Sequence, residues 1–484
     1  MSNFIGIDLG TSGVKILLVS KDGKILKEVT ENYPTSHPYS GWSEQNPEDW
    51  YSAVICGLER LNAKNVAGIS CGGQMHGLVI LDENDMVIRP CILWNDGRTG
   101  GETDYLNNKV GKDKLAACTA NIAFAGFTAP KLLWIKQNEP ENFNKIAKIM
   151  LPKDYIIYRL TGEFSTDYSD ASGTLLFDVK NRRWNEEMCG ICGICGGQLP
   201  KLYESYASVG YVKKPISDKF NWGEVTVAAG AGDNAAAAVG TGTVKGGDCN
   251  ISLGTSGTLF IANDGFSLPE NNALHSFCHA NGRFHYLGCI LSAASANKWW
   301  IEDILQENYN LAEKASDSLG KNEVIFLPYL MGERCPHNDV AARGAFIGLS
   351  ADTMKEEMAL AVLEGVAFAF RDCLEIVKES GLNVTQSTVC GGGAKSKLWQ
   401  TVLSNVLGLN LYTVETEQGP AYGAAMLAMV AGGEYKSVED AAEALVKKQL
   451  SVTPDSELIK AYNDKYNLYR QIYPLLKGIK KSAH

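Results

Sequence analysis

The sequence lacks the features of a membrane-spanning or exported chain. No apolar run approaches the roughly 18 residues of a membrane-spanning helix, and the longest candidate, residues 358–370, is interrupted by Glu364 and Gly365. The N-terminus has no basic stretch followed by an apolar segment, so we expect no signal peptide. We therefore expect a cytoplasmic protein with no membrane partner, whose 13 cysteines are reduced thiols.

Positive charge is also scarce. The chain has 45 lysines and arginines against 55 aspartates and glutamates, a net charge of −10, and the basic residues do not cluster. This balance argues against a nucleic-acid partner. The 484 residues are 45% hydrophobic and 21% charged, which is typical of a globular protein of two or three domains. The sequence leaves the assembly state open, a homodimer included.

An internal repeat divides the chain. Strand-like and helix-like segments alternate throughout, which predicts an α/β architecture. The pentapeptide Leu-Gly-Thr-Ser-Gly at residues 9–13 recurs at residues 253–257, almost half the chain length away. Both copies lie in a glycine-bearing turn between two strand-like runs. We therefore expect two duplicated domains, residues 1–245 and residues 246–484.

The first copy of the repeat is a candidate phosphate-binding turn. It is neither a P-loop nor a Rossmann fingerprint, because another strand follows the glycines. Glycines let a ligand approach the backbone closely, and N–H groups and hydroxyls suit phosphate oxygens. The carboxylate of Asp8 could hold a hydrated Mg²⁺. A plain hairpin with a capping aspartate is the alternative, which the second copy makes less attractive. The candidate ATP ligands are Gly10, Thr11, Ser12 and Lys15, with Gly254 and Thr255 in the second copy.

A third glycine-rich turn, Gly391-Gly392-Gly393-Ala394, lies between a strand and a helix expected at residues 397–407. Glycines at a helix N-terminus can form a nucleotide site, here through Gly392, Gly393 and Ala394. The alternative is a tight turn that needs glycine only for packing. The three turns together predict a nucleotide held in a central cleft between two duplicated actin-like (ribonuclease H-like) domains.

Asp233 is the candidate catalytic base. It precedes Asn234 and a run of four alanines with high helix propensity, so it lies near a helix N-terminus. That position favours an ionised carboxylate, which can accept a proton from an attacking hydroxyl. A purely structural N-cap is the alternative.

Two polar segments suit a polyol. Gln74, Met75 and His76 follow a strand-like run, and Trp94 opens the polar turn Trp94-Asn95-Asp96-Gly97-Arg98. Amide, imidazole, carboxylate and guanidinium groups beside an aromatic face can bind sugar hydroxyls. A structural loop and an Asx turn are the alternatives.

Many segments, in order along nearly the whole chain, resemble the FGGY family of carbohydrate kinases. They include Gly41-Trp42-Ser43-Glu44-Gln45, Gly232-Asp233-Asn234 and Gly332-Glu333-Arg334, and residues 126–138 and 344–365 look like the two family signatures. The other matching segments are residues 5–15, 73–77, 92–98, 151–155, 162–164, 252–257, 275–280, 291–295 and 391–394.

The resemblance implies ATP- and Mg²⁺-dependent phosphorylation of the C5 hydroxyl of D-xylulose. It implies that Asp233 is the base and that Asp8 lies near the metal, with both as candidate metal and catalytic residues. The implied substrate residues are Gln74, Met75, His76, Trp94, Asp233 and Asn234. Among the nucleotide residues it implies Gly254, Thr255, Gly393 and Ala394.

Two further clusters have no place in this scheme. Cys189, Cys192 and Cys195 resemble part of an iron–sulfur motif but lack a fourth ligand, so we expect a loop of reduced thiols. His275, Cys278, His279 and His285 look like a metal set, but they flank a predicted hairpin turn. Strand alternation should place neighbouring side chains on opposite faces, which would scatter this cluster away from a shared metal.

Two other functions, that of a mechanical ATPase and that of a dehydrogenase, fit parts of the sequence. A mechanical ATPase of the actin-like class would not need the polyol segments around His76 and Trp94. A dehydrogenase using the Gly391 turn would leave the duplicated hairpins unexplained.

Overall fold

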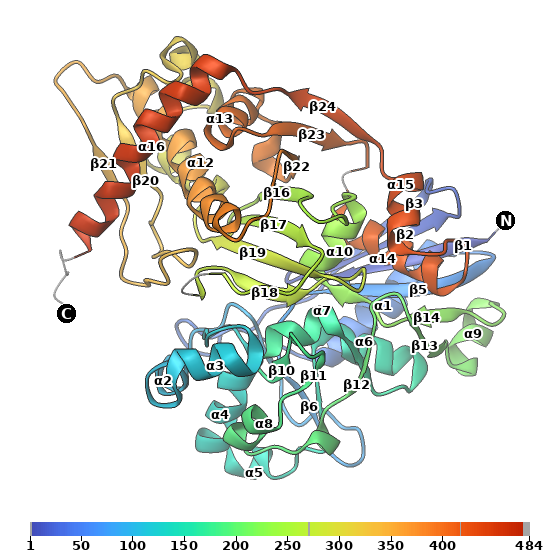
Figure 1. Ribbon diagram of the computed structural model, residues 1–484. Coiled ribbons are helices and arrows are strands. Elements are labelled where there is room, and N and C mark those ends of the chain that lie inside the picture. Colours follow the sequence, from blue (N-terminus) through green and yellow to red (C-terminus); the bar gives the residue numbers. More distant parts are fainter. Residues whose placement is uncertain (1, 270–271, 417, 478–484) are drawn as a thin grey trace.

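Two mixed β-sheets organise the chain in the computed structural model, which describes residues 2–269, 272–416 and 418–477 (Figure 1). We call residues 1–245 the first half and residues 246–484 the second half. The strand order of the first sheet is β13-β14-β5-β1-β2-β3, and β15 also pairs with β5. The bounds are β1 Asn3–Leu9, β2 Gly13–Ser20, β3 Ile25–Asn32, β5 Val66–Gly73, β13 Ser208–Tyr211, β14 Thr226–Ala228 and β15 Ala231–Gly232.

The second sheet repeats the plan of the first. Its strand order is β18-β19-β17-β16-β22-β23-β24. In both sheets an antiparallel hairpin (β1–β2, β16–β17) is followed on one side by a third antiparallel strand and on the other by a parallel strand. The bounds are β16 Cys249–Leu253, β17 Gly257–Asn263, β18 His275–Cys278, β19 Phe284–Ile290, β22 Gln386–Cys390, β23 Asn410–Val414 and β24 Lys448–Val452. The predicted α/β class with two duplicated domains is confirmed, whereas the division at residue 245 stays a prediction.

Helices cover the sheets, and none in the described ranges is long and apolar enough to cross a membrane. The main helices are α1 Pro47–Leu61, α4 Thr128–Asn138, α6 Pro152–Thr161, α7 Tyr168–Ala171, α8 Glu186–Cys192, α10 Asp233–Gly240, α11 Ala294–Lys298, α12 Lys355–Glu379, α13 Lys397–Leu407, α14 Gly419–Ala431, α15 Val438–Leu445 and α16 Ser456–Leu476. Smaller paired strands are β4 Glu44–Gln45 with β7 Cys91–Ile92, β6 Val79–Leu81 with β8 Lys148–Met150, β9 Ser165–Asp167 with β12 Lys201–Tyr203, β10 Phe177–Asp178 with β11 Arg183–Trp184, and β20 Ile325–Leu327 with β21 Ala345–Ile347.

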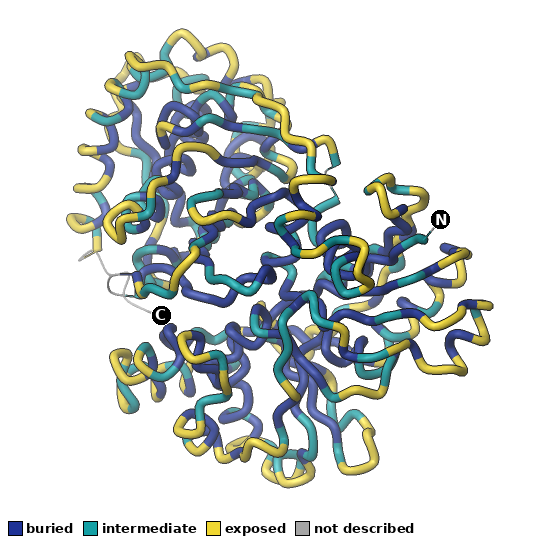
Figure 2. The backbone as a smooth tube through the Cα atoms, turned by 45° about the vertical axis from the view of Figure 1, so that its right-hand side comes forward, coloured by how far each residue is buried: buried dark blue, intermediate teal, exposed yellow. Residues whose placement is uncertain are grey.

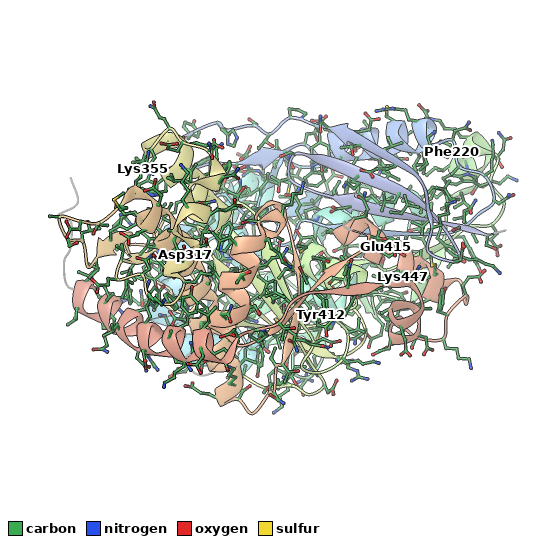
Figure 3. All side chains as sticks on the ribbon, turned by 90° about the horizontal axis from the view of Figure 1, so that it is seen from above. Phe220, Asp317, Lys355, Tyr412, Glu415 and Lys447 are labelled. Atoms are coloured by element: carbon green, nitrogen blue, oxygen red, sulfur yellow. The ribbon has the colours of Figure 1, made fainter. Side chains whose placement is uncertain are left out.

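Buried apolar side chains run through both halves, and the exposed residues concentrate in loops and outer helix faces (Figure 2). Charged residues line the outer edges. Glu415 and Lys447, at the ends of β23 and β24, form an ion pair of 3.8 Å (Figure 3). Such an exposed pair contributes little to stability. Burial of apolar surface therefore holds each half together.

Helix α14 joins the two halves. It lies between β23 and β24 of the second sheet in sequence, yet it packs across β1 and β5 of the first sheet and crosses α10. A Cβ atom on Gly423 would lie 1.8 Å from the carbonyl oxygen of Ala236 in α10, and one on Gly240 would lie 2.5 Å from that of Gly419. Only glycine permits this approach, so the contact between the halves is a close crossing of two helix backbones.

We expect Gly423→Ala to lower the midpoint of thermal unfolding, because the new methyl group would overlap the α10 backbone. Overpacking of this kind typically costs about 1–3 kcal/mol and sometimes more. Gly190→Ala in α8 is the matched control, since a Cβ there meets nothing within 4 Å and alanine favours a helix. Equal unfolding midpoints for the two variants in calorimetry would contradict the steric argument.

Candidate active site

Two aspartates meet at one edge of the first sheet. Asp8 lies near the end of β1, and Asp233 opens α10 directly after β15. In the register of the parallel strands, Asp8 and Ala231 both pair with Gly72 of β5. The carboxyl ends of parallel strands share an edge of the sheet, and Gly72 puts no side chain between the two aspartates. The structure therefore brings the two predicted catalytic residues together.

Burial raises the pKa of both carboxyl groups, of Asp8 to about 7 and of Asp233 to about 6. The charge of Asp233 raises the pKa of Asp8 further, whereas Lys15, opposite Asp8 in β2, lowers it. Asp233 Oδ1 accepts hydrogen bonds from the backbone N and the Nδ2 of Asn234, at 2.7 and 2.9 Å. Two neighbouring buried carboxylates repel each other, and a cation between them would relieve both the repulsion and the cost of burial.

The donor set fits Mg²⁺. This ion is typically bound by one or two carboxylates, with water and substrate phosphates completing its octahedron. Within the described residues, no group of three or more His, Cys, Asp or Glu side chains is arranged for a metal. Asp8 and Asp233 are thus suited to an ion that takes most of its ligands from a substrate, not to a closed structural metal site.

A buried glutamine, which the sequence analysis did not select, links the first glycine turn to the polyol segments. Gln45 Nε2 donates to the carbonyl oxygen of Thr11 (2.6 Å), and Gln45 Oε1 accepts from Gln74 Nε2 (3.1 Å) and Trp50 Nε1 (2.9 Å). Trp94 Nε1 donates to Thr11 Oγ1 (3.0 Å). Three predicted residues of two different sites therefore share one hydrogen-bonded network. The only signal in the sequence was the motif at residues 41–45, which carried no role.

Lys15 contacts residues outside the first glycine turn. Its Nζ donates to Oε1 of Gln418 (2.8 Å), the residue before α14, and lies 3.4 Å from Glu28. Gly10 and Ser12 remain in the predicted turn between β1 and β2. The nucleotide role of these residues stays a prediction.

His76 is held as a neutral imidazole. Its Nδ1 lies 2.7 Å from the carbonyl oxygen of Gly173, which it reaches as a donor, leaving Nε2 as an acceptor. The ring stacks on Phe127 with centroids 4.6 Å apart. Burial, and then the charge of Lys131, lowers the pKa of His76 to about 3. Met75 packs against Gly232, the residue before Asp233. The Met75–His76 segment therefore borders the aspartate pair, with an acceptor nitrogen free for a hydroxyl group.

A cavity of about 1050 Å³ lies within the second half. Thr255, Gly392 and Gly393 line it, so it brings together the second and third glycine turns. Gly391 has φ +91°, and a Cβ there would lie 2.8 Å from the Leu253 backbone, so glycine is required where these turns meet. Ala394, also predicted, is buried and does not line the cavity.

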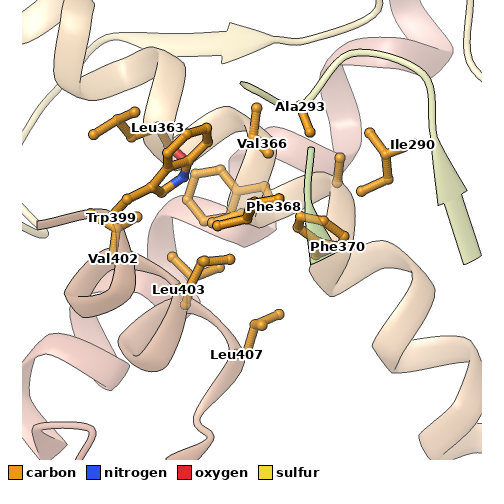
Figure 4. Packing of buried hydrophobic residues seen from close by; sticks show 14 of the residues in the cluster. Ile290, Ala293, Leu363, Val366, Phe368, Phe370, Trp399, Val402, Leu403 and Leu407 are labelled. Atoms are coloured by element: carbon orange, nitrogen blue, oxygen red, sulfur yellow. The ribbon is translucent and has the colours of Figure 1, made fainter. Parts of the chain in front are cut away.

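Trp399 of α13 lines this cavity. It is almost fully buried and donates from Nε1 to the carbonyl oxygen of Leu363 in α12 (3.2 Å). It packs beside Leu363, Val366 and Phe368 (Figure 4). Other lining residues come from the segment around α11 and from the connection before β21. Ser292, Ala294 and Ser295 lie in a segment that the sequence analysis matched to the family without a role, and the others carry no motif. The lining residues of these two segments are Ser292, Ala294, Ser295, Asn297, Lys298, Trp299, Asp303, Tyr309, Asn310, Ala312, Glu313, Leu330 and Met331.

The expectation that alternation scatters the histidines was wrong. His275, Phe277 and His279 follow each other at alternate positions and share a face, and His285 pairs with Phe277 in the register of β18 and β19. The rings of His279 and His285 lie 5.7 Å apart, and His285 stacks on Phe260. Burial lowers the pKa of all three histidines, so they are neutral members of an aromatic cluster.

The expectation that Cys189, Cys192 and Cys195 lie in a loop was wrong for the first two. Cys189 and Cys192 are buried in α8, and only Cys195 is exposed beyond the helix. None of the 13 cysteines, all of which lie in the described ranges, forms a disulfide bond. Burial raises the pKa of Cys189 to about 11 and that of Cys192 to about 12, which keeps them as thiols.

We expect Gln45→Met to weaken binding of both nucleotide and sugar several-fold, because it removes the bridge from the Thr11 carbonyl to the Gln74 amide and leaves only the 3.4 Å hydrogen bond from Thr11 Oγ1 to Gln74 Oε1. The orphaned Trp50 N–H should also cost about 1–3 kcal/mol of stability. Gln198→Met is the matched control, since Gln198 also bonds a backbone carbonyl, that of Ile146, far from the aspartates. Titration calorimetry with each ligand checks the expectation. Loss of affinity for one ligand alone would contradict the coupling.

Comparisons with known proteins show which family the chain resembles in sequence and fold. The N-terminal domain of the FGGY family of carbohydrate kinases matches residues 3–240, and its C-terminal domain matches residues 249–432. A xylulose kinase of Escherichia coli (strain K12) is 40% identical over 98% of this chain and 99% of its own length, and one of Bacillus subtilis (strain 168) is 37% identical over 99% and 98%. A crystal structure of a xyloylose (xylulose) kinase from Brucella ovis has a TM-score of 0.94 at 39% identity and covers 99% of this chain and 100% of that one. The chain belongs to the FGGY family of carbohydrate kinases.

Proposed function

We propose that the chain transfers the γ-phosphoryl group of ATP to the C5 hydroxyl of D-xylulose, giving D-xylulose 5-phosphate and ADP. The observation that carries the proposal is the meeting of Asp8 and Asp233 at one sheet edge beside the neutral His76. The xylulose kinase relatives at up to 40% identity support the choice of sugar. The α/β kinase architecture by itself would serve many polyols.

Asp233 is the base in this proposal. Its carboxylate would orient the C5 hydroxyl in line with the γ-phosphorus and accept the proton as the new O–P bond forms. Asn234, through its two hydrogen bonds to Oδ1, holds the carboxylate in place and leaves Oδ2 for the hydroxyl. The N-terminus of α10 favours the ionised form that accepts the proton. Phosphoryl transfer depends chiefly on such positioning, since its transition state is loose.

Asp8 and Asp233 would hold Mg²⁺. When bound, this ion supplies charge neutralisation on the β- and γ-phosphates. The rise in the pKa of both carboxyl groups supports the assignment, because two buried like charges with no counter-ion are costly.

In this proposal the two halves of the chain bind different parts of the substrates. Residues 1–245 would hold the sugar and the first phosphate turn through Gly10, Thr11, Ser12 and Lys15. Residues 246–484 would hold the adenosine in the 1050 Å³ cavity, with Thr255 in its lining and Gly254, which does not line it, next to Thr255 in the same turn. Closure about the α10–α14 crossing would exclude water, the competing phosphoryl acceptor.

The proposal includes a cytoplasmic location, where ATP and reduced thiols coexist. Every residue assigned a role lies on one chain. A homodimer is therefore compatible with the proposed activity but is not required for it.

We expect D-xylulose to have the highest kcat/KM in a panel that includes D-ribulose and glycerol, measured by coupled release of ADP. The physical reason is that the polyol segments position donors and acceptors for particular hydroxyl groups. Glycerol is shorter and D-ribulose has the opposite configuration at C3, so each would leave some of these groups unpaired. Faster turnover of D-ribulose or glycerol would overturn the sugar assignment while leaving the family intact.

We expect Asp233→Asn to lower kcat by at least about 10²–10⁴-fold while ATP still binds, because the amide keeps the shape but cannot take the proton. Coupled ADP release and titration calorimetry with ATP separate the two effects. Asp264→Asn is the control, since Asp264 forms an exposed ion pair with Arg283. Near-normal turnover of Asp233→Asn would remove this residue from the role of base.

A further inference from the structure

Arg334 reaches from the second half to the first. It lies in the connection between β20 and β21, and its guanidinium carbon stands 4.9 Å from the ring centroid of Phe124 in the first half. A Cβ atom on Gly126 would lie 3.7 Å from its Nη2. Phe124 and Gly126 precede α4. The side chain is half-buried, so its charge stands at the junction of the two halves.

The surroundings of Arg334 are those of the proposed sugar. The Gly126 backbone abuts Trp94, because a Cβ there would lie 2.4 Å from the Trp94 carbonyl oxygen. Burial lowers the pKa of His76, and the charge of Arg334 lowers it further. The thiol of Cys289 is buried, and the charges of both Arg334 and Asp233 act on its pKa. Arg334 is therefore within electrostatic range of the residues assigned to the sugar and to proton transfer.

The charge of Arg334 is not matched by a carboxylate. Within the described residues, no Asp or Glu oxygen lies within 4.0 Å of its guanidinium, whereas the buried Arg98 is paired with both Asp96 and Glu44 at 2.7 Å. The adjacent Glu333 turns its Oε1 to the backbone N–H groups of Leu291 and Arg334, at 3.0 and 2.8 Å. Burial raises the pKa of Glu333 to about 8, so it supplies little negative charge at neutral pH.

We propose that Arg334 is a substrate-positioning residue whose guanidinium donates hydrogen bonds to oxygen atoms of the sugar, opposite His76. The inference rests on the proposed function. A guanidinium offers five N–H donors in a fixed plane, and the hydroxyl and ketone oxygens of a ketose are acceptors. Because Asp233 takes the C5 hydroxyl, Arg334 would hold oxygens further along the sugar chain.

The sugar, and not the phosphate chain of ATP, is the better partner for Arg334. The second and third glycine turns open into the 1050 Å³ cavity, and Arg334 does not line that cavity. It contacts instead Phe124 and the side chain of Cys289, and it lies close to Gly126, beside Trp94. Since Arg334 belongs to the second half and His76 to the first, a bound sugar would bridge the halves and favour their closure.

Arg334→Gln tests the proposal, with Arg343→Gln as the matched control. Arg343 is an exposed arginine of the same connection that donates only to the backbone carbonyls of Val340 and Ala342. The Kd of D-xylulose without nucleotide, the KM of each substrate, kcat and the unfolding midpoint are measured for each variant. We expect the Kd and KM for D-xylulose to rise roughly 10- to 100-fold in Arg334→Gln alone, as for a lost charged hydrogen bond. The KM for ATP and the unfolding midpoint should be unchanged, and Arg334→Lys should be intermediate.

Two results would overturn the inference while the wild-type chain is active. Unchanged sugar affinity with a lower kcat would move Arg334 to the transferring phosphoryl group. A lower unfolding midpoint with an equal loss of affinity for both substrates would make its role structural. A wild-type chain that neither binds nor phosphorylates any sugar of the panel would refute the proposed function, and this inference with it.

Discussion

Two half-buried carboxyl groups placed side by side, Asp8 and Asp233, are the constraint on which the rest of the structure depends. Desolvation penalises the charge of each, and the charge of Asp233 penalises that of Asp8. Below them Lys153 Nζ is surrounded by the carboxylates of Asp154, Asp167 and Asp170, at 2.5, 2.9 and 3.7 Å. Burial raises the pKa of Asp170 well above its usual value, so this group holds a proton more readily than a free aspartate. The carboxyl groups at the sheet edge suit a divalent cation brought in with a nucleotide.

The same edge of the first sheet adjoins the close junction between the two halves. Asp233 is the first residue of α10, and α10 is the helix that α14 crosses with backbone nearly touching backbone. Small residues of the two helices meet at the crossing and belong to one buried apolar cluster, so a rotation there would have to shift closely packed backbones. A rotation about this crossing would move the second half relative to the aspartate edge. The helix that positions the base is thereby also part of the junction.

The polar network around Gln45 and the side chain of Arg334 suggest how binding of one substrate could be coupled to binding of the other. Gln45 joins the Thr11 turn to Gln74, and Arg334 carries a charge of the second half to Phe124 and Gly126 of the first. Both residues lie in motifs that the sequence comparison had marked without a role. Their function became arguable only when their neighbours were known, since neither hydrogen bonds nor unmatched charge can be read from spacing along the chain.

The sequence by itself determined the duplication, the three glycine turns and the candidate base, because these are local properties. Repeats, turn glycines and a helix start depend on residues that are near each other in the chain. Only the tertiary structure decided that Asp8 and Asp233 share one edge across Gly72, that Ala394 stands outside the cavity, and that three histidines share a face. It also decided that α14 packs on the first sheet, which no local pattern indicates. The physical reason is that strand register and helix crossings bring together residues hundreds of positions apart, and burial then sets their charges.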